Sequence, residues 1–466
     1  MAKTAPALPK GTRDFLPRDL VLRNRAFALL RATFERYGFE PLETPAVELT
    51  SVLEGKYGEE GDRLLFRVLK RGHDLESAGR AVAALPEDER GAAQLARELS
   101  DMALRYDLTV PFARVVAAHL NDLALPFRRY QMQPVWRGDR PQKGRYREFY
   151  QCDVDCVGSR SVTVEAEMLA MVNELFSALG FAEFTIHINH RALLDALQAV
   201  SGVPADSRVA VLTAIDKLDK IGADGVREEL AKTAISADAL ERLMAIVALT
   251  GTPRELIARL RPLVGESREG VAGLDDLEAL FGYLEALGVP PARYAFDLAM
   301  VRGLAYYTGT IYETTVTRPK IGTLSSGGRY DRLIGQFLGR DLPCVGVSFG
   351  LDRMFDAMAE LGLLGGDETT TTQALVTLFG PETTAAAFAL ARDLRAAGIR
   401  TEVYAEPKEL RPQLAFASKK GIPLALILGP DELARGEVTL RDLRAGSQRS
   451  LPLAEAPAAA TALLEG

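Results

Sequence analysis

Residues 128–155 read RRYQMQPVWRGDRPQKGRYREFYQCDVD and predict the centre of the fold. Between Arg128 and Arg147, seven side chains are basic and one, Asp139, is acidic, so the stretch carries +6 in a protein of net charge −7. Glycines and a proline in its middle favour two strands joined by a polar loop. Most charge runs are simply solvated, but a local reversal of charge this large indicates a polyanionic ligand.

The returning strand of this hairpin has one polar and one apolar face, because side chains alternate along a strand. The polar face holds Phe149, Gln151, Asp153 and Asp155, and the apolar face holds Tyr150, Cys152, Val154 and Cys156. A carboxylate and an amide can bind an ammonium group or an imidazole, and the Phe149 ring offers a surface on which a base can stack. Arg137, just before the loop, has the planar fork that suits a phosphate. A solvated hairpin would not require this polar row.

Residues 137–151, RGDRPQKGRYREFYQ, resemble the second signature motif of class II aminoacyl-tRNA synthetases in its histidyl-tRNA synthetase form. The resemblance implies an α+β fold, in which an antiparallel-sheet catalytic domain carries a helical insertion and precedes a C-terminal α/β anticodon-binding domain. The expected parts are a catalytic domain (1–190 and 292–364), an insertion (191–291), a linker (365–372) and an anticodon-binding domain (373–466).

Composition indicates a soluble, multidomain protein. A chain of 466 residues, 47% of them apolar, is too long for one ordinary core. Three cysteines indicate a reducing compartment without a disulfide framework. No apolar run suits a signal peptide or a membrane span, so we expect a cytoplasmic protein without membrane contact. The acidic net charge argues against indiscriminate binding of DNA or RNA, so any RNA contact must be local.

No metal-binding residues are expected. Cys152 and Cys156 with His187 and His190 suggest zinc ligands, but alternation puts both cysteines on the buried face of a strand. The cysteines are therefore interpreted as core residues and the histidines as structural.

A second polar pair lies in Tyr106-Asp107-Leu108-Thr109, after a predicted strand at 102–105. Alternation would put Asp107 and Thr109 on one face, where a carboxylate and a hydroxyl suit an α-ammonium group. A turn or helix cap is the alternative, because Asp and Thr are common in both. In the family that the sequence resembles, the matching acid and threonine bind the amino group of histidine.

Residues 302–307, Arg-Gly-Leu-Ala-Tyr-Tyr, lie between two β-rich runs and resemble a motif specific to histidyl-tRNA synthetases. Paired tyrosines are usually core aromatics. The resemblance instead implies that Arg302 lies against the reacting α-phosphate and that Tyr307, next to Tyr306, reaches the substrate ring. Ala305 is a departure, since many members have Asp there.

Four further stretches also match the family. PKGTRDFLP at 9–17 resembles its opening, and a predicted helix at 20–37, followed by Gly38 and an extended segment, resembles the first class II motif, which forms a dimer interface. SGGRYD at 326–331 resembles the second histidine motif. VGVSFGLDRM at 345–354 resembles the third class II motif, whose arginine, Arg353 here, binds the γ-phosphate.

Two regions remain less specific. Residues 191–291 have leucine and alanine at helical spacing; a role near the tRNA acceptor arm, as in the family, and a purely structural role are equally compatible with this pattern. Residues 373–466 predict β-α-β-α-β and a hairpin, with eleven basic and eleven acidic side chains. Charge alone therefore gives no support for RNA binding there.

The resemblance implies a histidine-tRNA ligase that uses ATP and Mg²⁺ to form histidyl-adenylate and then charges tRNA(His), as a homodimer. The implied catalytic residues are Arg137 and Arg302; the ATP-binding residues are Arg137, Phe149 and Arg353; the histidine-binding residues are Asp107, Thr109, Gln151, Asp155, Arg302, Tyr306 and Tyr307; and the tRNA acceptor contacts are Gln142 and Arg147.

Two other functions are considered. A non-catalytic, synthetase-like regulatory subunit of histidine biosynthesis is disfavoured by the retained Arg302, Tyr306 and Tyr307 and by the terminal α/β domain. A class II synthetase for another amino acid would share Arg137 and Arg353, but not the Arg-Gly-Leu-Ala-Tyr-Tyr segment.

Overall fold

The computed structural model describes residues 6–86, 90–233, 235–265, 267–301, 306–364 and 369–465. The chain forms two compact units: Met1–Arg13 with Leu29–Leu363, and Asp14–Ala28 with Leu364–Gly466. Each unit is described by itself. None of the described helices is long and apolar enough to cross a membrane.

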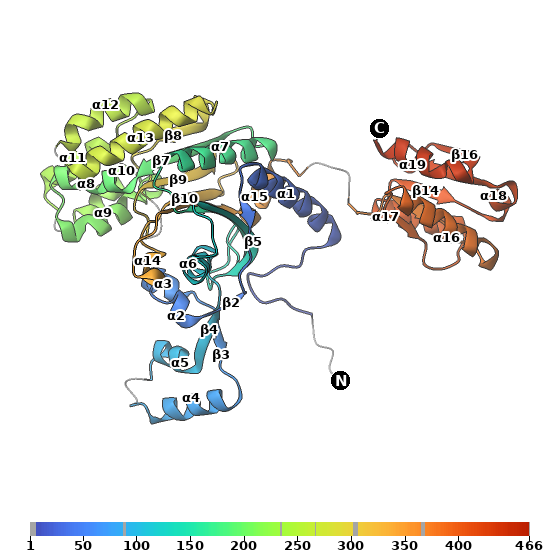
Figure 1. Ribbon diagram of the computed structural model, residues 1–466, viewed down its shortest axis with the longest axis horizontal. Helices are drawn as coiled ribbons and strands as arrows, with labels where there is room; N and C mark the ends of the chain where they lie inside the picture. The colour runs from blue at the N-terminus through green and yellow to red at the C-terminus, as the bar shows by residue number, and fades with distance from the viewer. Residues whose placement is uncertain are drawn as a thin grey trace. The chain divides into compact units, whose positions relative to one another are not determined.

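An eight-stranded sheet, ordered β1-β5-β6-β11-β10-β9-β7-β8, forms the centre of the first unit (Figure 1). Its strands are β1 Glu40–Pro41, β5 Phe127–Trp136, β6 Glu148–Val157, β7 Phe184–His190, β8 Tyr294–Phe296, β9 Thr310–Val316, β10 Ser325–Arg329 and β11 Cys344–Gly350. The neighbours from β5 to β7 pair antiparallel, whereas the short β1 and β8 pair parallel to β5 and β7. A largely antiparallel sheet with helices added is the predicted α+β class.

The predicted hairpin is the pair β5 and β6, in which Gln131 lies opposite Asp153 and Arg129 opposite Asp155. The predicted alternation is confirmed, because Gln151, Asp153 and Asp155 line a cavity whereas Cys152, Val154 and Cys156 are fully buried away from it. All three cysteines of the chain are free and buried. Within the described ranges, no three His, Cys, Asp or Glu side chains are grouped so that they could hold a metal ion.

Helices flank this sheet. They are the part of α1 (Pro17–Arg36) from Leu29 on, α6 Thr109–Ala118, α7 Thr163–Ala178, α14 Gly335–Leu338 and α15 Leu351–Glu360. Phe34, near the end of α1, packs on the rings of Tyr130 and Phe349 from β5 and β11. Phe176 of α7 contacts Phe349 as well, so both helices bury aromatic side chains against the middle of the sheet.

α-Helices occupy the range for which the sequence predicts a helical insertion (Figure 1). They are α8 Arg191–Ser201, α9 Arg208–Ile215, α10 Leu218–Leu230, α11 Ala237–Val247, α12 Pro253–Val264 and α13 Arg268–Ala286. Their apolar core includes Val211 and Leu243 and continues to Ile311 of β9. This helical region is therefore attached to the eight-stranded sheet by shared packing.

A second, three-stranded sheet, ordered β2-β4-β3, lies in the same unit. The elements of this region are β2 Val47–Leu49, α2 Thr50–Leu53, α3 Gly58–Arg63, β3 Arg67–Leu69, α4 Gly72–Ala84, α5 Ala92–Leu99 and β4 Ser100–Leu104. Of these, β4 overlaps the strand predicted at 102–105 and begins two residues before it.

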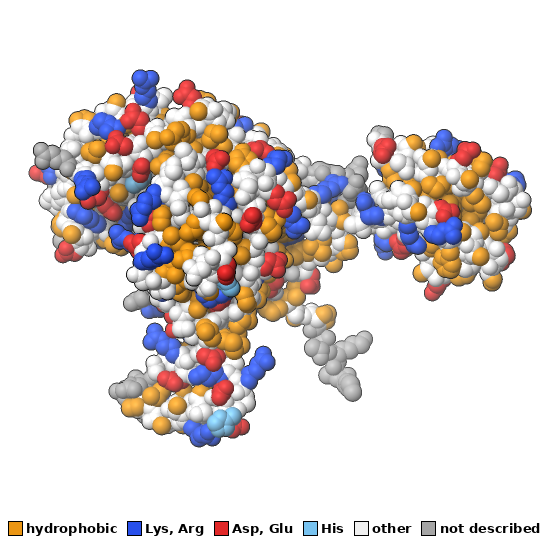
Figure 2. Space-filling model, in the orientation of Figure 1, with side chains coloured by type: hydrophobic (Ala, Val, Ile, Leu, Met, Phe, Trp, Pro, Cys, Tyr) orange, Lys and Arg blue, Asp and Glu red, His pale blue; other side chains and the backbone are white. Residues whose placement is uncertain are grey.

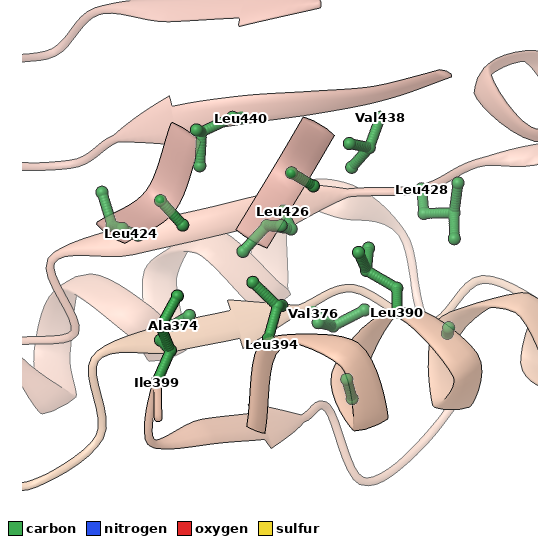
Figure 3. Close-up of a cluster of buried hydrophobic side chains, with 14 of the residues drawn as sticks. Ala374, Val376, Leu390, Leu394, Ile399, Leu424, Leu426, Leu428, Val438 and Leu440 are labelled. Carbon is green, nitrogen blue, oxygen red and sulfur yellow. The ribbon is translucent and has the colours of Figure 1, made fainter. Parts of the chain in front are cut away.

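The second unit contains a five-stranded sheet, ordered β13-β12-β14-β15-β16, with the predicted β-α-β-α-β and hairpin. Its elements are β12 Ala374–Val376, α16 Pro381–Ala396, β13 Thr401–Val403, α17 Leu410–Lys420, β14 Leu424–Ile427, α18 Pro430–Arg435, β15 Glu437–Asp442, β16 Gln448–Pro452 and α19 Ala456–Glu465. Figure 3 shows Leu390 and Leu394 of α16 pointing at Val376 and Leu426 on the sheet. Basic and acidic side chains both occur on the face of this unit seen in Figure 2.

Candidate active site

A cavity of about 360 Å³ opens on the sheet of the first unit. Nine of the predicted site residues line it: Asp107, Thr109, Arg137, Phe149, Gln151, Asp155, Tyr306, Tyr307 and Arg353. They come from the turn before α6, the β5–β6 hairpin, the segment before β9 and the start of α15. Segments more than 200 residues apart in the sequence therefore meet around one space, which no local pattern could establish.

Three predicted residues are not among those lining the cavity. Gln142 and Arg147 lie in the hairpin loop, where Gln142 pairs with Arg145 in an isolated bridge. Arg302 lies outside the described residues, as does Ala305. The placement of the Arg-Gly-Leu-Ala part of the motif therefore stays a prediction.

Asp107 and Thr109 do not lie on a strand, so the alternation argument for them was wrong. Thr109 is the first residue of α6, and the Asp107 carboxylate accepts a hydrogen bond from the backbone N–H of Val110 (3.1 Å). This is the helix-cap alternative. Both side chains nevertheless line the cavity, because the turn before the helix faces it.

The Asp107 carboxylate has a second partner that sequence reasoning missed. The Tyr57 hydroxyl donates to its Oδ1 at 2.9 Å, and the Tyr57 ring packs on that of Tyr106 at 4.5 Å between centroids. Burial raises the pKa of Asp107, and the Val110 N–H and the Arg137 charge act against that rise. Tyr57 precedes α3 in a segment without a recognised motif, so no sequence signal connects it with Asp107.

Arg137 is held between two aromatic rings. The centre of its guanidinium group lies 4.3 Å from the centroid of the Tyr106 ring and 5.1 Å from that of Phe149. Its Nε donates to the Tyr106 carbonyl oxygen at 3.0 Å, and its Nη2 donates to Gln151 Oε1 at 3.4 Å. These contacts fix the plane of the guanidinium group beside the cavity, which pre-organises it for a phosphate.

Arg353, two residues into α15, lies beside the cavity. Its Nε donates to the carbonyl oxygen of Gly144 in the hairpin loop at 3.1 Å, and its Nη1 donates to that of Thr323 at 2.7 Å. Burial lowers the pKa of Arg353, and the charges of Arg145 and Arg137 lower it further. Three guanidinium groups that repel one another around one cavity indicate a site for a multiply charged anion.

Asp155 lies in the floor of the cavity, and both of its carboxylate oxygens have partners in the protein. Its Oδ2 lies 2.6 Å from Nη2 of the fully buried Arg129, and its Oδ1 accepts a hydrogen bond from the Tyr330 hydroxyl. Burial raises the pKa of Asp155, while Arg129 and the Tyr330 hydroxyl oppose that rise. The backbone of Gly346 lies so close that a Cβ there would be 1.9 Å from Asp155 Oδ1, so only glycine leaves room for this carboxylate.

This ion pair corrects the first interpretation of the basic stretch. Arg129 does not contribute to an accessible positive patch, and Arg128 pairs with Glu167. The accessible positive charge at the cavity comes instead from Arg137, Arg145 and Arg353. A charge count along the sequence cannot separate a buried, paired arginine from an exposed one.

Asp153 is a second buried carboxylate on the same face of β6. Burial, with a contribution from Asp155, raises its pKa to about 7, although Arg129 acts to lower it. Gln151 connects this face to β11, since its Nε2 donates to Ser348 Oγ at 2.7 Å. The predicted polar row includes Asp153, but alternation along a strand does not predict a pKa near neutrality.

Tyr306 and Tyr307 complete the wall of the cavity. Their rings meet edge to face, 4.9 Å between centroids, and Tyr306 also contacts the Tyr330 ring at 5.6 Å. Burial raises the pKa of both phenols, so they stay protonated and can donate a hydrogen bond.

The histidines considered as metal ligands are structural. His187 Nδ1 lies 2.8 Å from Asp297 Oδ2 and its Nε2 lies 3.0 Å from Thr315 Oγ1, so it joins β7 to its neighbours. His190 lies 3.4 Å from Asp276 of α13. These pairs use the imidazole nitrogens for packing the insertion and the sheet together.

An antiparallel sheet that carries one arginine on a hairpin and another at the start of a helix, both beside one cavity, defines the class II aminoacyl-tRNA synthetases. Residues 82–354 match the family model described as histidyl-tRNA synthetase, and residues 373–463 match that of an anticodon binding domain. The chain belongs to the histidyl-tRNA synthetase family.

Individual relatives agree with this assignment. The chain is 46% identical to a histidine-tRNA ligase of Gloeobacter violaceus, and the match covers 96% of both chains. Among solved structures, a histidyl-tRNA synthetase from Nostoc sp. PCC 7120 has a TM-score of 0.84 at 32% identity, covering 98% of this chain and 99% of that one. A Bacillus halodurans protein titled both as an ATP phosphoribosyltransferase regulatory subunit and as a histidyl-tRNA synthetase has a TM-score of 0.70 at 25% identity, covering 89% and 96% of the two chains.

Proposed function

We propose that this chain is a histidine-tRNA ligase: it joins histidine to ATP as histidyl-adenylate, releases pyrophosphate and transfers the histidyl group to the 3′-terminal ribose of tRNA(His). The observation that carries the proposal is the cavity in which a buried carboxylate row meets the guanidinium groups of Arg137 and Arg353. The carboxylate end of the cavity suits a ligand with an ammonium group and an imidazole, and the arginine end suits a triphosphate.

Histidine is recognised through groups that other side chains cannot satisfy. Asp107 and Thr109 accept hydrogen bonds from the α-ammonium group, with Gln151 nearby. Asp155 and Tyr307 take one imidazole nitrogen each. A carboxylate has about four lone-pair sites, so Asp155 can accept from the ring while it keeps Arg129 and Tyr330. An amino acid without ring nitrogens would leave these buried groups unpaired, which supports discrimination of the order of 10⁴.

In the first step a histidine carboxylate oxygen attacks the α-phosphorus of ATP. A new O–P bond forms, the bond to the bridging oxygen breaks, and pyrophosphate leaves with the electron pair. Two anions approach each other, so the site must supply positive charge to the pentavalent phosphorus. Arg137 and Arg302 supply it in this proposal, Arg353 binds the γ-phosphate and Phe149 stacks on adenine.

Magnesium fits this site as an ion held mainly by the nucleotide. Mg²⁺ is typically bound through one or two carboxylates together with phosphate oxygens and water, and the carboxylates of Glu313 and Asp139 line the cavity. When bound, the ion would neutralise phosphate charge. The described residues would then orient the triphosphate and the histidine carboxylate.

The second step joins histidine to tRNA. A terminal ribose hydroxyl attacks the activated carbonyl carbon, and AMP leaves. The exposed loop of the hairpin, with Gln142 and Arg147, contacts the acceptor end in this proposal. Residues 373–466 bind the anticodon, and 191–291 form an insertion whose helices offer a surface for the acceptor arm.

The proposed enzyme is a cytoplasmic homodimer. β2 is an edge strand whose Val47 and Leu49 side chains are 37% and 55% exposed. They border a groove that also includes Leu42, Pro45 and Met102. Exposed apolar side chains on a sheet edge favour a protein partner. Sedimentation equilibrium would give about twice the chain mass of 50.6 kDa for a dimer.

The amino-acid-dependent exchange of pyrophosphate into ATP tests the assignment. Each of the twenty amino acids is supplied in turn, and exchange is expected with histidine alone. Exchange with another amino acid would identify a different class II synthetase, and exchange with none would favour a regulatory subunit. We expect Arg302→Ala to slow histidine-dependent exchange by about 10² to 10³, as for loss of a charge-stabilising donor.

A further inference from the structure

Residues 9–13 pack against the loop of the β5–β6 hairpin. A turn at the start of this segment is closed by Thr12, whose hydroxyl donates to the Pro9 carbonyl oxygen at 2.8 Å. The next contact is with the loop itself, where the Arg147 N–H donates to the Gly11 carbonyl oxygen at 2.8 Å. Gly11 has φ +85°, and a Cβ there would lie 2.8 Å from Arg147 Cγ, so this close approach requires glycine.

Arg13 joins three groups from two other elements. Its Nη2 lies 2.6 Å from Asp352 Oδ1, and its Nη1 lies 3.5 Å from Asp356 Oδ1, both on α15. The guanidinium group also stacks on the ring of Tyr146 in the hairpin loop, 3.5 Å from the ring centroid. The Tyr146 hydroxyl donates to Asp356 Oδ2 at 2.8 Å, which closes the network.

One partner of Arg13 also acts on Arg353, because the negative charge of Asp356 acts to raise the pKa of that guanidinium group. Asp352 and Asp356 lie one residue before and three residues after it on α15, and Arg353 itself donates to Gly144 in the loop. Asp352 is buried, and its Oδ2 accepts from the backbone N–H of Tyr150. Arg13 is therefore placed to offset the Asp356 carboxylate, which would otherwise compete with a phosphate for Arg353.

We propose that Arg13 is a positioning residue for ATP: it holds the hairpin loop 138–147 against α15 and offsets the charge of Asp356, so that Arg353 presents its full positive charge to the triphosphate. The inference deepens the proposed ligase function and rests on it. It gives the Pro-Lys-Gly-Thr-Arg segment, residues 9–13, a role in the site without direct contact with substrate.

Pyrophosphate exchange with titrated ATP and histidine tests the role. Arg13→Ala should raise KM for ATP about tenfold, as for loss of a charge-assisted contact, and should leave KM for histidine within about twofold. Arg13→Lys keeps the positive charge but loses the planar guanidinium group, so its KM for ATP should lie between those of wild type and Arg13→Ala. An unchanged KM for ATP in Arg13→Ala would overturn the proposal.

A double variant separates the electrostatic role from mere stabilisation. Arg13→Ala with Asp356→Asn removes one uncompensated charge while the asparagine oxygen still accepts from Tyr146. We expect it to recover at least about a third of the lost ATP affinity, because the competing charge of Asp356 is gone. If KM for ATP and KM for histidine rise together in Arg13→Ala and the double variant recovers nothing, Arg13 is only structural and the proposal fails.

A fluorescence measurement tests whether Arg13 anchors the hairpin loop, without relying on enzymatic activity. Trp136 is the only tryptophan and lies at the end of β5, where its indole N–H donates to Glu148 at 3.0 Å beside the loop. Acrylamide quenching of Trp136 should increase in Arg13→Ala and not in Arg261→Ala. Arg261 is the matched control, since it likewise pairs with two acids, Asp275 and Glu278, in the insertion.

The two failures can therefore be told apart. Absence of histidine-dependent exchange in the wild type would refute the proposed function, whatever the quenching shows. Equal quenching in Arg13→Ala and wild type would refute the anchoring by Arg13, even in a fully active enzyme.

Discussion

Arg129 and Asp155 form an ion pair in the floor of the cavity, with 2.6 Å between Nη2 and Oδ2 and side-chain exposures of 0% and 4%. Arg129 also donates to Gln131 Oε1 at 3.1 Å and lies over the Phe112 ring. A buried charge is tolerable only when it is paired. The pair therefore keeps Asp155 oriented toward the cavity with its charge compensated.

Replacing Arg129 should be strongly destabilising. Arg129→Met leaves the Asp155 carboxylate without its partner, and breaking a buried pair in this way costs about 3–5 kcal/mol. Urea unfolding followed at Trp136 measures this loss in the first unit.

The adjacent arginine provides the control. Arg128 pairs with Glu167 at side-chain exposures of 28% and 40%, so Arg128→Met should cost about 1 kcal/mol or less. Equal losses for the two substitutions would show that burial of the Arg129 pair has no energetic role.

Asp153 should make stability depend on pH. Its pKa in the folded chain is about 7, above the ordinary value of 3.8, so the folded state binds a proton that the unfolded state has lost. The contribution of Asp153 to the free energy of unfolding is fully present below about pH 4. It is lost as the pH rises through about 7, at up to about 1.4 kcal/mol per pH unit.

Comparison with Asp153→Asn isolates this contribution. The free energy of unfolding of Asp153→Asn minus that of wild type should be more positive at pH 8 than at pH 5, because the wild type must ionise a buried acid. A difference that does not change between these pH values would mean that Asp153 titrates normally.

Tyr57 should support histidine binding without affecting ATP. Tyr57→Phe removes the hydrogen bond to Asp107 but keeps the ring contact with Tyr106. Loss of one hydrogen bond near an ammonium site should raise KM for histidine about fivefold. Pyrophosphate exchange gives both constants. A rise in KM for ATP instead would place the effect at the Arg137 side of the cavity.

The hairpin loop should matter for tRNA more than for adenylate formation. Gln142→Ala and Arg147→Ala should lower kcat/KM for tRNA about tenfold, as for loss of a charged or polar contact to the acceptor end, and leave exchange within about twofold. Arg160→Ala, which changes an exposed arginine outside the loop, is the control. Equal losses in both half-reactions would contradict this division of roles.

Alternation along β6 predicted the polar and apolar faces of the hairpin correctly, since period-two patterns are local. The same rule failed for Asp107 and Thr109, because a helix starts at Thr109 and the chain turns there. Tyr57 and Arg129 could not be assigned, since their partners are set by tertiary packing. The family motifs predicted that residues from distant segments belong to one site. In the structure, most of those residues line one cavity.

Binding of a non-hydrolysable histidyl-adenylate analogue, measured by titration calorimetry against the phenylalanyl analogue, tests the central claim most directly. The two ligands share the adenosine and differ only in the ring that Asp155 and Tyr307 are proposed to bind. We expect the histidyl analogue to bind at least about 10³-fold more tightly, because the phenyl ring leaves buried polar groups unpaired. Equal affinities would contradict recognition of an imidazole by this cavity.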